Sequence, residues 1–215
     1  MKKRVCVFDL DGTLLNTIKD LGMSCNAALK TVSLDPLPLE QYTFLVGSGM
    51  KNLIWKASDF SPKTLEFDRI FHAFLDYYQA HSTDFTSVYP GIPELLKKLH
   101  SKGVSLAVLS NKGESFVKDL VRHYFGDRIF SIVRGQSERF AVKPDPSSLL
   151  DIIQQFQAVQ SEVLYVGDSD VDVKTAKNAG VFCVGAVWGF RGETELREAG
   201  ANALAYRPLD VIHWI

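Results

Sequence analysis

Two aspartates, Asp9 and Asp11, follow directly on the apolar run Val5–Phe8 near the start of the chain. A short apolar run of this kind predicts a strand buried on both faces, and parallel sheets bind ligands at the carboxyl ends of their strands. Because side chains alternate along a strand, both carboxylates can point the same way, where they repel each other unless a proton or a hard cation such as Mg²⁺ relieves them. Gly12 would let the backbone approach a ligand closely. The alternative interpretation of this stretch alone is an ordinary Asp-Gly turn.

Polar residues also follow two later segments, 104–109 and 163–166, that are predicted strands: Ser110, Asn111, Asp168 and Asp172. The carboxyl ends of parallel strands lie on one edge of a sheet, so these side chains can converge although they are distant in sequence. Lys143, in a proline-bounded loop before a predicted helix, can add a positive charge there. Taken singly, each residue could cap a helix or lie in solvent. Together they predict a site for a metal ion and a phosphoryl group.

The elements that must position these residues change in type along the chain. From Pro90-Gly91 onward, helices predicted at 92–101, 114–124, 147–157, 171–179 and 194–199 alternate with strands predicted at 104–109, 129–133, 163–166, 181–187 and 203–206. Strands separated by helices predict an α/β fold with a Rossmann-like, doubly wound parallel sheet.

Residues 17 to 85 show no strand pattern. Helices are predicted there at about 17–34, with Asn16 or Thr17 as cap, then at 39–46 and 50–57, and from Ser61-Pro62 to about 80. This block therefore predicts an inserted α-helical cap at 16–85, and residues 1–15 and 86–215 form the predicted core.

The composition predicts a cytoplasmic, soluble protein that binds neither nucleic acid nor a membrane. The 24 basic and 25 acidic residues give a net charge of −1, without the basic excess of nucleic-acid-binding domains. No stretch approaches the ~18 apolar residues of a membrane-spanning helix, and the first apolar run is too short for a signal peptide. Three widely separated cysteines do not suggest a disulfide framework. Both a monomer and a homodimer remain open.

Four motifs resemble, in order, those of the haloacid dehalogenase superfamily: Phe8–Leu14, Ser110–Lys112, Lys143–Pro144 and Gly167–Asp172. Each motif alone is weak, but four in order at strand ends are specific. The helical insertion is similar to the cap of the phosphoglycolate phosphatase and β-phosphoglucomutase group. Three further segments are most similar to the phosphoglycolate phosphatase branch: Val88–Gly91, Lys143–Pro146 and Trp188–Arg191.

The resemblance implies a role for each motif residue. Asp9 would attack phosphorus and form an aspartyl-phosphate, and Asp11 would protonate the leaving alcohol and later activate water. Lys143 would neutralise charge on the nucleophile and the phosphoryl group. Mg²⁺ would be held by Asp9, by Asp168 and by the backbone carbonyl of Asp11, whose carboxylate would lie off the metal, while Asp172 would orient metal-bound water or Lys143. Phosphoryl oxygens would be held by Gly12, Thr13, Ser110 and Asn111.

Gly47-Ser48-Gly49 lies between two predicted cap helices. By the resemblance, a glycine-containing turn there would face the site and help choose the substrate. The helix that follows from Met50 could direct its N-terminus at a substrate carboxylate; an ordinary helix–helix turn is an equal alternative. Lys51 and Lys112 are further candidates for anion contacts. Trp188 and Arg191 match the branch, but their types suggest no role.

The sequence therefore predicts a Mg²⁺-dependent phosphatase of small phosphorylated metabolites, with phosphoglycolate as the leading substrate. An inorganic pyrophosphatase and a β-phosphoglucomutase-like mutase are the alternatives within the same class. A phospho-accepting signalling domain also uses strand-end aspartates and a lysine, but the Asp-x-Asp-Gly-Thr arrangement and the inserted cap argue against it. A phosphometabolite-binding protein that has lost catalysis is disfavoured because all four motifs are present.

Overall fold

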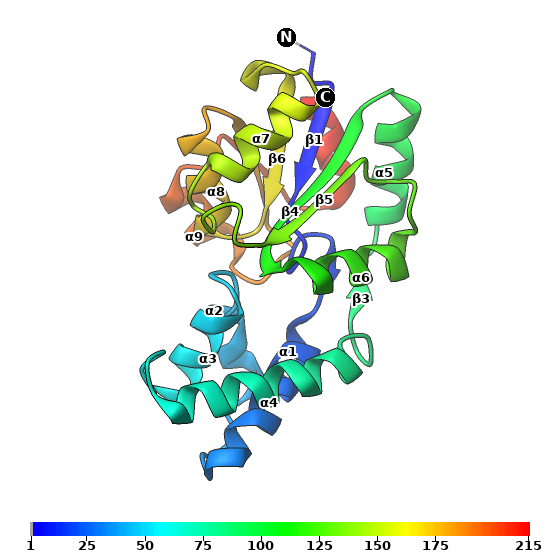
Figure 1. Cartoon of the computed structure of the whole chain (residues 1–215). Helices are drawn as coiled ribbons and strands as arrows, with labels where there is room; N and C mark the ends of the chain where they lie inside the picture. Colours follow the sequence, from blue (N-terminus) through cyan, green and yellow to red (C-terminus); the bar gives the residue numbers. More distant parts are fainter. Residues whose placement is uncertain (1) are drawn as a thin grey trace.

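A parallel sheet of six strands lies at the centre of the computed structural model, which describes residues 2–215 (Figure 1). Its strands, in spatial order, are β5 (Ile132–Gln136), β4 (Ser105–Gly113), β1 (Val5–Phe8), β6 (Val163–Gly167), β7 (Phe182–Ala186) and β8 (Ala203–Ala205). Val5 pairs with Ser105 on one side and Val163 on the other, which places β1 between two parallel neighbours. The carboxyl ends of β1, β4 and β6 therefore lie side by side.

Helices cover both faces of the sheet. One face packs against α5 (Ile92–Ser101), α6 (Glu114–Phe125) and the 3₁₀ segment η4 (Pro208–Trp214), and the other against α7 (Ser147–Gln155), α8 (Asp170–Asn178) and α9 (Gly192–Ala199). Side chains alternate between the two faces along β1, so Cys6 and Phe8 pack on the first face and Val5 and Val7 on the second. The prediction of a doubly wound α/β core is confirmed.

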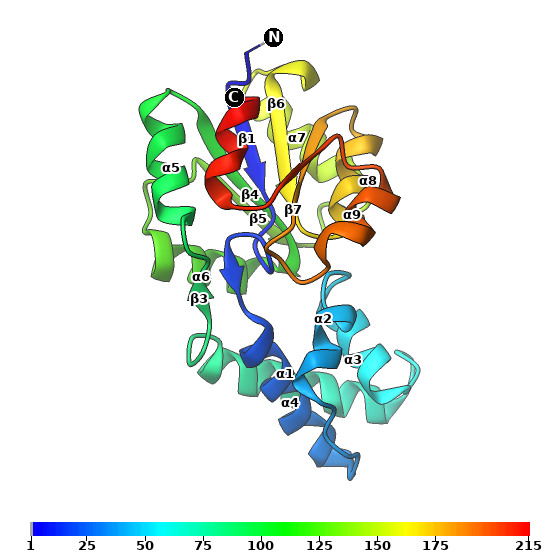
Figure 2. The same cartoon turned by 180° about the vertical axis from the view of Figure 1, so that it is seen from behind.

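A helical cap lies beyond the carboxyl edge of the sheet, as both views show (Figures 1 and 2). It consists of α1 (Ile18–Leu29), α2 (Tyr42–Leu45), α3 (Met50–Ser58) and α4 (Leu65–His81), with short 3₁₀ turns at Lys30–Val32 and Leu39–Gln41. The cap has its own apolar core, in which α1, α3 and α4 bury Leu21, Ile54 and Phe74.

Two connecting segments join the cap to the core, and they pair with each other. Strand β2 (Leu15–Asn16) runs antiparallel to β3 (Ser87–Val88). Asp20 in α1 reinforces the junction, because its buried carboxylate accepts hydrogen bonds from the backbone N–H of Phe85 and from both the N–H and the hydroxyl of Thr86. We propose this junction as the division between the core (1–15 and 86–215) and the cap (16–85).

One local prediction about a helix start was wrong, and of the two cap candidates for α1 it is Asn16 whose side chain accepts from the Ile18 N–H, at 3.4 Å. Helix α4 begins at Leu65 rather than at Ser61-Pro62, because the Thr64 hydroxyl caps it by accepting from the Phe67 N–H at 3.2 Å. Thr17 precedes α1 but makes no side-chain cap bond; its hydroxyl donates to Asp11 Oδ1 at 2.6 Å instead. Within residues 2–215, no helix is long and apolar enough to cross a membrane.

Candidate active site

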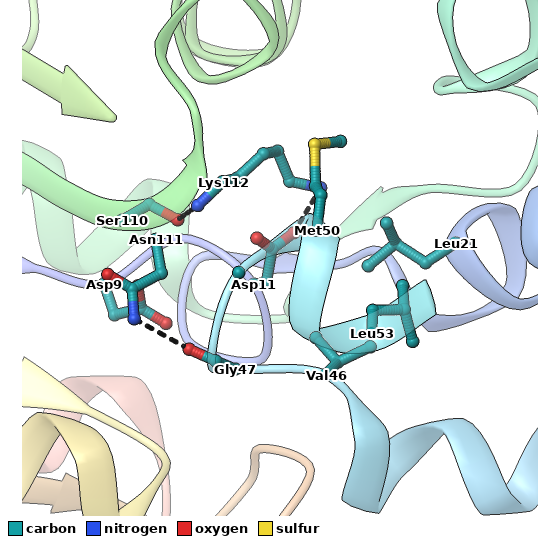
Figure 3. Close-up of a pocket in the computed structure, with 11 residues that line it drawn as sticks. Asp9, Asp11, Leu21, Val46, Gly47, Met50, Leu53, Ser110, Asn111 and Lys112 are labelled. Atoms are coloured by element: carbon teal, nitrogen blue, oxygen red, sulfur yellow. Dashed lines mark hydrogen bonds and ion pairs between the residues drawn. The ribbon is translucent and has the colours of Figure 1, made fainter. Parts of the chain in front are cut away.

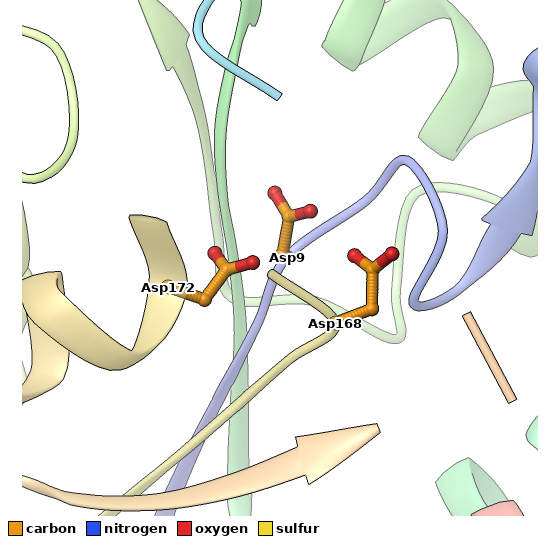
Figure 4. A group of neighbouring side chains, drawn as sticks. All are labelled: Asp9, Asp168 and Asp172. Atoms are coloured by element: carbon orange, nitrogen blue, oxygen red, sulfur yellow. The ribbon is translucent and has the colours of Figure 1, made fainter. Parts of the chain in front are cut away.

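Three buried carboxylates, from Asp9, Asp168 and Asp172, meet at the carboxyl edge of the sheet (Figure 4). Each offers one oxygen, and these oxygens lie within 4.8 Å of one another. Asp9 follows β1 and Asp168 follows β6, while Asp172 lies in the first turn of α8. Carboxylate oxygens at this spacing are the donors that hard divalent cations prefer, so the group fits a metal ion.

Asp172 accepts four hydrogen bonds from protein donors, more than Asp168 or Asp9 accepts. Oδ1 accepts from Lys143 Nζ at 2.7 Å and from the Tyr165 hydroxyl at 3.1 Å. Oδ2 accepts from the N–H and the hydroxyl of Ser169 at 3.1 and 2.6 Å, which forms a capping box at the start of α8. These contacts fit the predicted supporting role and leave Asp9 and Asp168 as the stronger metal-ligand candidates.

Lys143 lies between two of these carboxylates, with Nζ 2.8 Å from Asp9 Oδ1 and 2.7 Å from Asp172 Oδ1. Burial alone would lower the pKa of its ammonium group, but Asp172 and Asp9 outweigh that effect and hold the pKa well above its usual value. Lys143 is therefore a permanent cation beside the predicted nucleophile. Asn111 holds its backbone in place, accepting from the Lys143 N–H at 2.8 Å and donating to the Lys143 carbonyl at 3.0 Å.

Burial raises the pKa of Asp9 to about 7; Lys143 opposes the shift, whereas Asp172 and Asp11 add to it. The pKa of Asp168 is also well above its usual value, first through burial and then through Asp172 and Asp9. A carboxyl group with a raised pKa keeps a proton that the unfolded chain has lost, so its ionisation costs folding stability as the pH rises. A cation in the group relieves that cost.

We therefore expect Mg²⁺ to raise the melting temperature more at about pH 8 than at about pH 6, because protons compete for Asp9 below its pKa of about 7. Thermal unfolding with and without Mg²⁺ measures both shifts, and Asp168→Asn, which removes one carboxylate, should reduce them. Equal stabilisation by Mg²⁺ at the two pH values would contradict the assignment of Asp9 as a metal ligand.

Asp168 is fixed by the loop that follows β7. Its Oδ2 accepts from the Phe190 N–H at 2.8 Å, and its Oδ1 accepts from the Thr13 hydroxyl at 3.3 Å. Gly12 and Gly189 make this packing possible, because a Cβ on either would lie 2.2 Å from an atom of the Asp168 side chain. Thr13 thus lies in the site, with its hydroxyl directed to Asp168.

Asp11 is not part of the carboxylate group that the described residues form. Its Oδ1 accepts from the Thr17 hydroxyl at 2.6 Å and lies 2.8 Å from Lys112 Nζ. This orientation fits a carboxylate that lies off the metal.

A small cavity lies between the strand-end carboxylates and the cap (Figure 3). The core contributes Asp9, Asp11, Ser110, Asn111 and Lys112 to its wall, and the cap contributes Leu21, Val46, Gly47, Gly49, Met50 and Leu53. Because the cavity is small, we expect its ligand to be a small molecule.

The cap turn faces the site only in part. Gly47 and Gly49 line the cavity with φ of +119° and +90°, conformations that favour glycine. The Gly47 carbonyl accepts from Asn111 Nδ2 at 3.0 Å. Ser48 lines a separate groove with Phe44 and residues of α8 and α9, because the turns at the two glycines direct it outward, and we do not retain it as a substrate contact.

Comparison with known proteins agrees with this geometry. Residues 6–186 match the family model of the haloacid dehalogenase-like hydrolases. The chain belongs to this family. It is 35% identical over 192 residues to a phosphoglycolate phosphatase of Pseudomonas fluorescens, covering 87% of this chain and 70% of the relative. It is 33% identical over 202 residues to one from Haemophilus influenzae, covering 91% and 90%.

Solved structures of this hydrolase family superpose on nearly the whole chain. A predicted phosphoglycolate phosphatase from Haemophilus somnus shares 26% identity with a TM-score of 0.90, covering 99% of this chain and 98% of its own. A putative phosphoglycolate phosphatase from Lactobacillus delbrueckii shares 27% identity with a TM-score of 0.89, covering 98% and 97%. The predicted family, and with it the prediction of an enzyme of the phosphoglycolate phosphatase-like type, is confirmed.

Several contacts of this hydrolase lie beyond what the sequence patterns indicated. Arg191 Nη2 donates to the carbonyls of Phe44 and Val46, at 3.1 and 2.8 Å, so the loop after β7 holds the end of α2. Trp188 Nε1 donates to the Thr13 carbonyl at 3.0 Å and fixes the loop after β1. The sequence does show that Trp188 and Arg191, two side chains with N–H donors, flank Gly189. The spacing of residues does not identify the carbonyl groups that accept from them.

The side-chain amide of one predicted phosphate contact, Asn111, is engaged elsewhere. Both donor hydrogens of the Asn111 amide are in use, on Gly47 and Lys143, so its side chain positions those residues. The Ser110 hydroxyl accepts from the Lys112 N–H at 3.2 Å and lines the cavity beside Asp9. Lys51, the other candidate anion contact, is exposed, with its ammonium 5.7 Å from the Phe71 ring centroid.

Proposed function

We propose that the protein is a Mg²⁺-dependent phosphatase of small phosphomonoesters and that Asp9 forms an aspartyl-phosphate intermediate. The observation that carries the proposal is the position of Lys143, a buried cation that joins Asp172 to Asp9, which lines the small capped cavity. When bound, Mg²⁺ would supply positive charge beside the phosphoryl oxygens, held by Asp9, Asp168 and the Asp11 carbonyl.

In the first step a carboxylate oxygen of Asp9 bonds to phosphorus as the phosphorus–ester oxygen bond breaks. Lys143 binds Asp9 Oδ1 at 2.8 Å, which restricts rotation of the carboxylate and leaves its charge partly neutralised as the dianion approaches. The Gly12 backbone and Ser110, which border the same group, are the proposed phosphoryl contacts, with Thr13 and Asn111 positioning their neighbours.

Asp11 is the proposed general acid and base. It would give its proton to the departing alcohol oxygen and then take a proton from the water that hydrolyses the aspartyl-phosphate, releasing phosphate and restoring Asp9. The bonds from Thr17 and Lys112 keep the Asp11 carboxylate away from the carboxylate group and at the wall of the cavity.

The proposed substrate is 2-phosphoglycolate. The small cavity supports a short leaving group, and the relatives from P. fluorescens and H. influenzae carry the name phosphoglycolate phosphatase. The cap wall is formed by apolar side chains and glycines, which offer few partners for the hydroxyl groups of a sugar.

Phosphate release in the presence of Mg²⁺ tests the proposal against its alternatives. The panel is 2-phosphoglycolate, pyrophosphate, hexose phosphates and nucleotides, and we expect the highest kcat/KM with 2-phosphoglycolate and loss of turnover with a chelator. A preference for pyrophosphate would favour a pyrophosphatase, and isomerisation of a sugar phosphate without phosphate release would favour a mutase. A stable phosphoprotein without turnover on any substrate would overturn the proposed function.

A further inference from the structure

Lys112 is a second buried lysine of the site, separate from the Asp9–Lys143–Asp172 contacts. It lies at the end of β4, its side chain is 2% exposed, and it lines the cavity between core and cap. Nζ lies 2.8 Å from Asp11 Oδ1 and donates to the Tyr78 hydroxyl of α4 at 2.7 Å. In Figure 3 the Lys112 side chain extends toward Asp11.

The ammonium group of Lys112 forms a buried ion pair with Asp11. Burying an ion pair gives little net stability, since apolar residues of similar volume often serve as well. The two observed contacts use two of the three ammonium hydrogens, so the group retains donor capacity toward a ligand.

The rest of the cavity wall offers no competing cation. Among the described residues that line it, Lys112 is the only one with a positive charge. Lys143 is engaged by Asp9 and Asp172 below. The cap side consists of Leu21, Val46, Met50, Leu53 and two glycines. A negative charge on the leaving group therefore has one side chain to neutralise it.

The position of Lys112 also limits where that charge can be. Asp11 is the proposed donor of a proton to the ester oxygen, and Lys112 Nζ is 2.8 Å from its Oδ1. The ammonium group therefore lies close to the atoms bonded to the ester carbon. A carboxylate attached directly to the ester carbon can reach the Lys112 ammonium group. A carboxylate further along the leaving group would instead lie beyond Lys112, against the apolar wall of the cavity.

We propose that Lys112 binds a carboxylate on the carbon that bears the phosphate ester, so that the enzyme selects phosphate esters of 2-hydroxy acids over neutral phosphomonoesters. This inference rests on the proposed phosphatase function and assigns the recognition of the leaving group to the core strand β4 rather than to a charged cap residue. Lys112 is then a specificity-determining residue that also orients Asp11.

The test compares 2-phosphoglycolate with its uncharged amide, glycolamide phosphate, as substrates. The wild-type enzyme should prefer the carboxylate by about 100-fold in kcat/KM, and Lys112→Met should remove most of that preference, because a buried charged contact contributes a few kcal/mol. The loss should appear mainly in KM, since the contact is made in ground state and transition state alike. Any effect of Lys112 on Asp11 acts on both substrates and cancels in the ratio.

Tyr78→Phe is the matched control, because it removes one partner of Lys112 and keeps the cation. Its carboxylate-to-amide ratio should stay within about threefold of the wild-type ratio. If Lys112→Met fails to fold, the wild-type ratio, together with stronger product inhibition by glycolate than by glycolamide, decides the question.

A wild-type ratio near one, or a Lys112→Met ratio equal to that of the wild type while both enzymes release phosphate, would overturn the inference and leave the phosphatase function standing. Absence of phosphate release from both compounds, and from the wider panel of phosphomonoesters, would overturn the proposed function and the inference with it.

Discussion

Asp9→Asn is expected to lower kcat by about 10⁴-fold or more while the protein remains folded, because an amide cannot form the aspartyl-phosphate. The change is nearly isosteric, and the amide oxygen can still accept from Lys143 Nζ, which lies 2.8 Å from Oδ1 in the wild-type protein. Phosphate release with 2-phosphoglycolate at saturating Mg²⁺ measures the loss.

The same variant has an expected effect of opposite sign on stability. Burial raises the pKa of Asp9 from 3.8 to about 7, so its cost in folding free energy grows between these two pH values and is complete above about pH 7. A neutral residue at this position should therefore raise the melting temperature of the metal-free protein more at about pH 8 than at about pH 5.

Asp170→Asn is the matched control, since this aspartate lies two residues from Asp168 but is paired with Lys174 at the surface of α8. It should change neither turnover nor melting temperature appreciably, because surface ion pairs contribute ~0–1 kcal/mol. Near-normal turnover by Asp9→Asn would remove Asp9 as the nucleophile.

The core of the fold could be predicted because its signals are local. Val5–Phe8 reads as a strand buried on both faces, and it is one. Each parallel strand that ends in polar residues contributes them to the same edge, so Asp9, Ser110 and Asp168 were expected together before any distance was known. The helical cap was visible in the same way, as a long stretch without a strand pattern.

The contacts between cap and core could not be predicted, because they join residues far apart in sequence. Arg191 and the carbonyl of Phe44 are 147 positions apart, and Asn111 and Gly47 are 64 apart. Periodicity reports which face of an element is buried, but it does not report the partner. The outward direction of Ser48 and the pairing of β2 with β3 depend on the same long-range arrangement.

The pairing of lysines with aspartates in the site could not be predicted from the sequence either. Asp9 and Asp11 are recognisable from the sequence as a repelling pair, and the predicted site contains one lysine, Lys143, that neutralises negative charge. The structure uses two: Lys143 pairs with Asp9 and Asp172, and Lys112 pairs with Asp11. The spacing of Ser110-Asn111-Lys112 could not distinguish the buried ion pair of Lys112 from a surface position, because its partner Asp11 lies far away in sequence, in the loop after β1.

Lys143→Met is expected to destabilise the protein by about 3–5 kcal/mol at about pH 8, because it leaves Asp9 and Asp172 buried without a counter-ion. The raised pKa of Lys143 gives the sign: its pairing stabilises the folded state at every pH below the usual lysine pKa. The destabilisation should shrink at about pH 5, where the carboxyl group of Asp9 takes up a proton. Turnover should fall by about 10³-fold.

A double variant separates loss of the ion pair from loss of packing. If the unpaired charge causes the destabilisation, adding Asp9→Asn to Lys143→Met should restore part of the stability, because one buried negative charge is removed. If lost packing causes it, the two effects should be additive, and Asp9→Asn should stabilise the double variant by no more than it stabilises the wild-type protein. Lys174→Met is the control for removing a lysine from a surface pair, with an expected change below about 1 kcal/mol. Chemical denaturation of the metal-free proteins at both pH values gives the coupling energy, and a value near zero would mean that Lys143 does not neutralise Asp9.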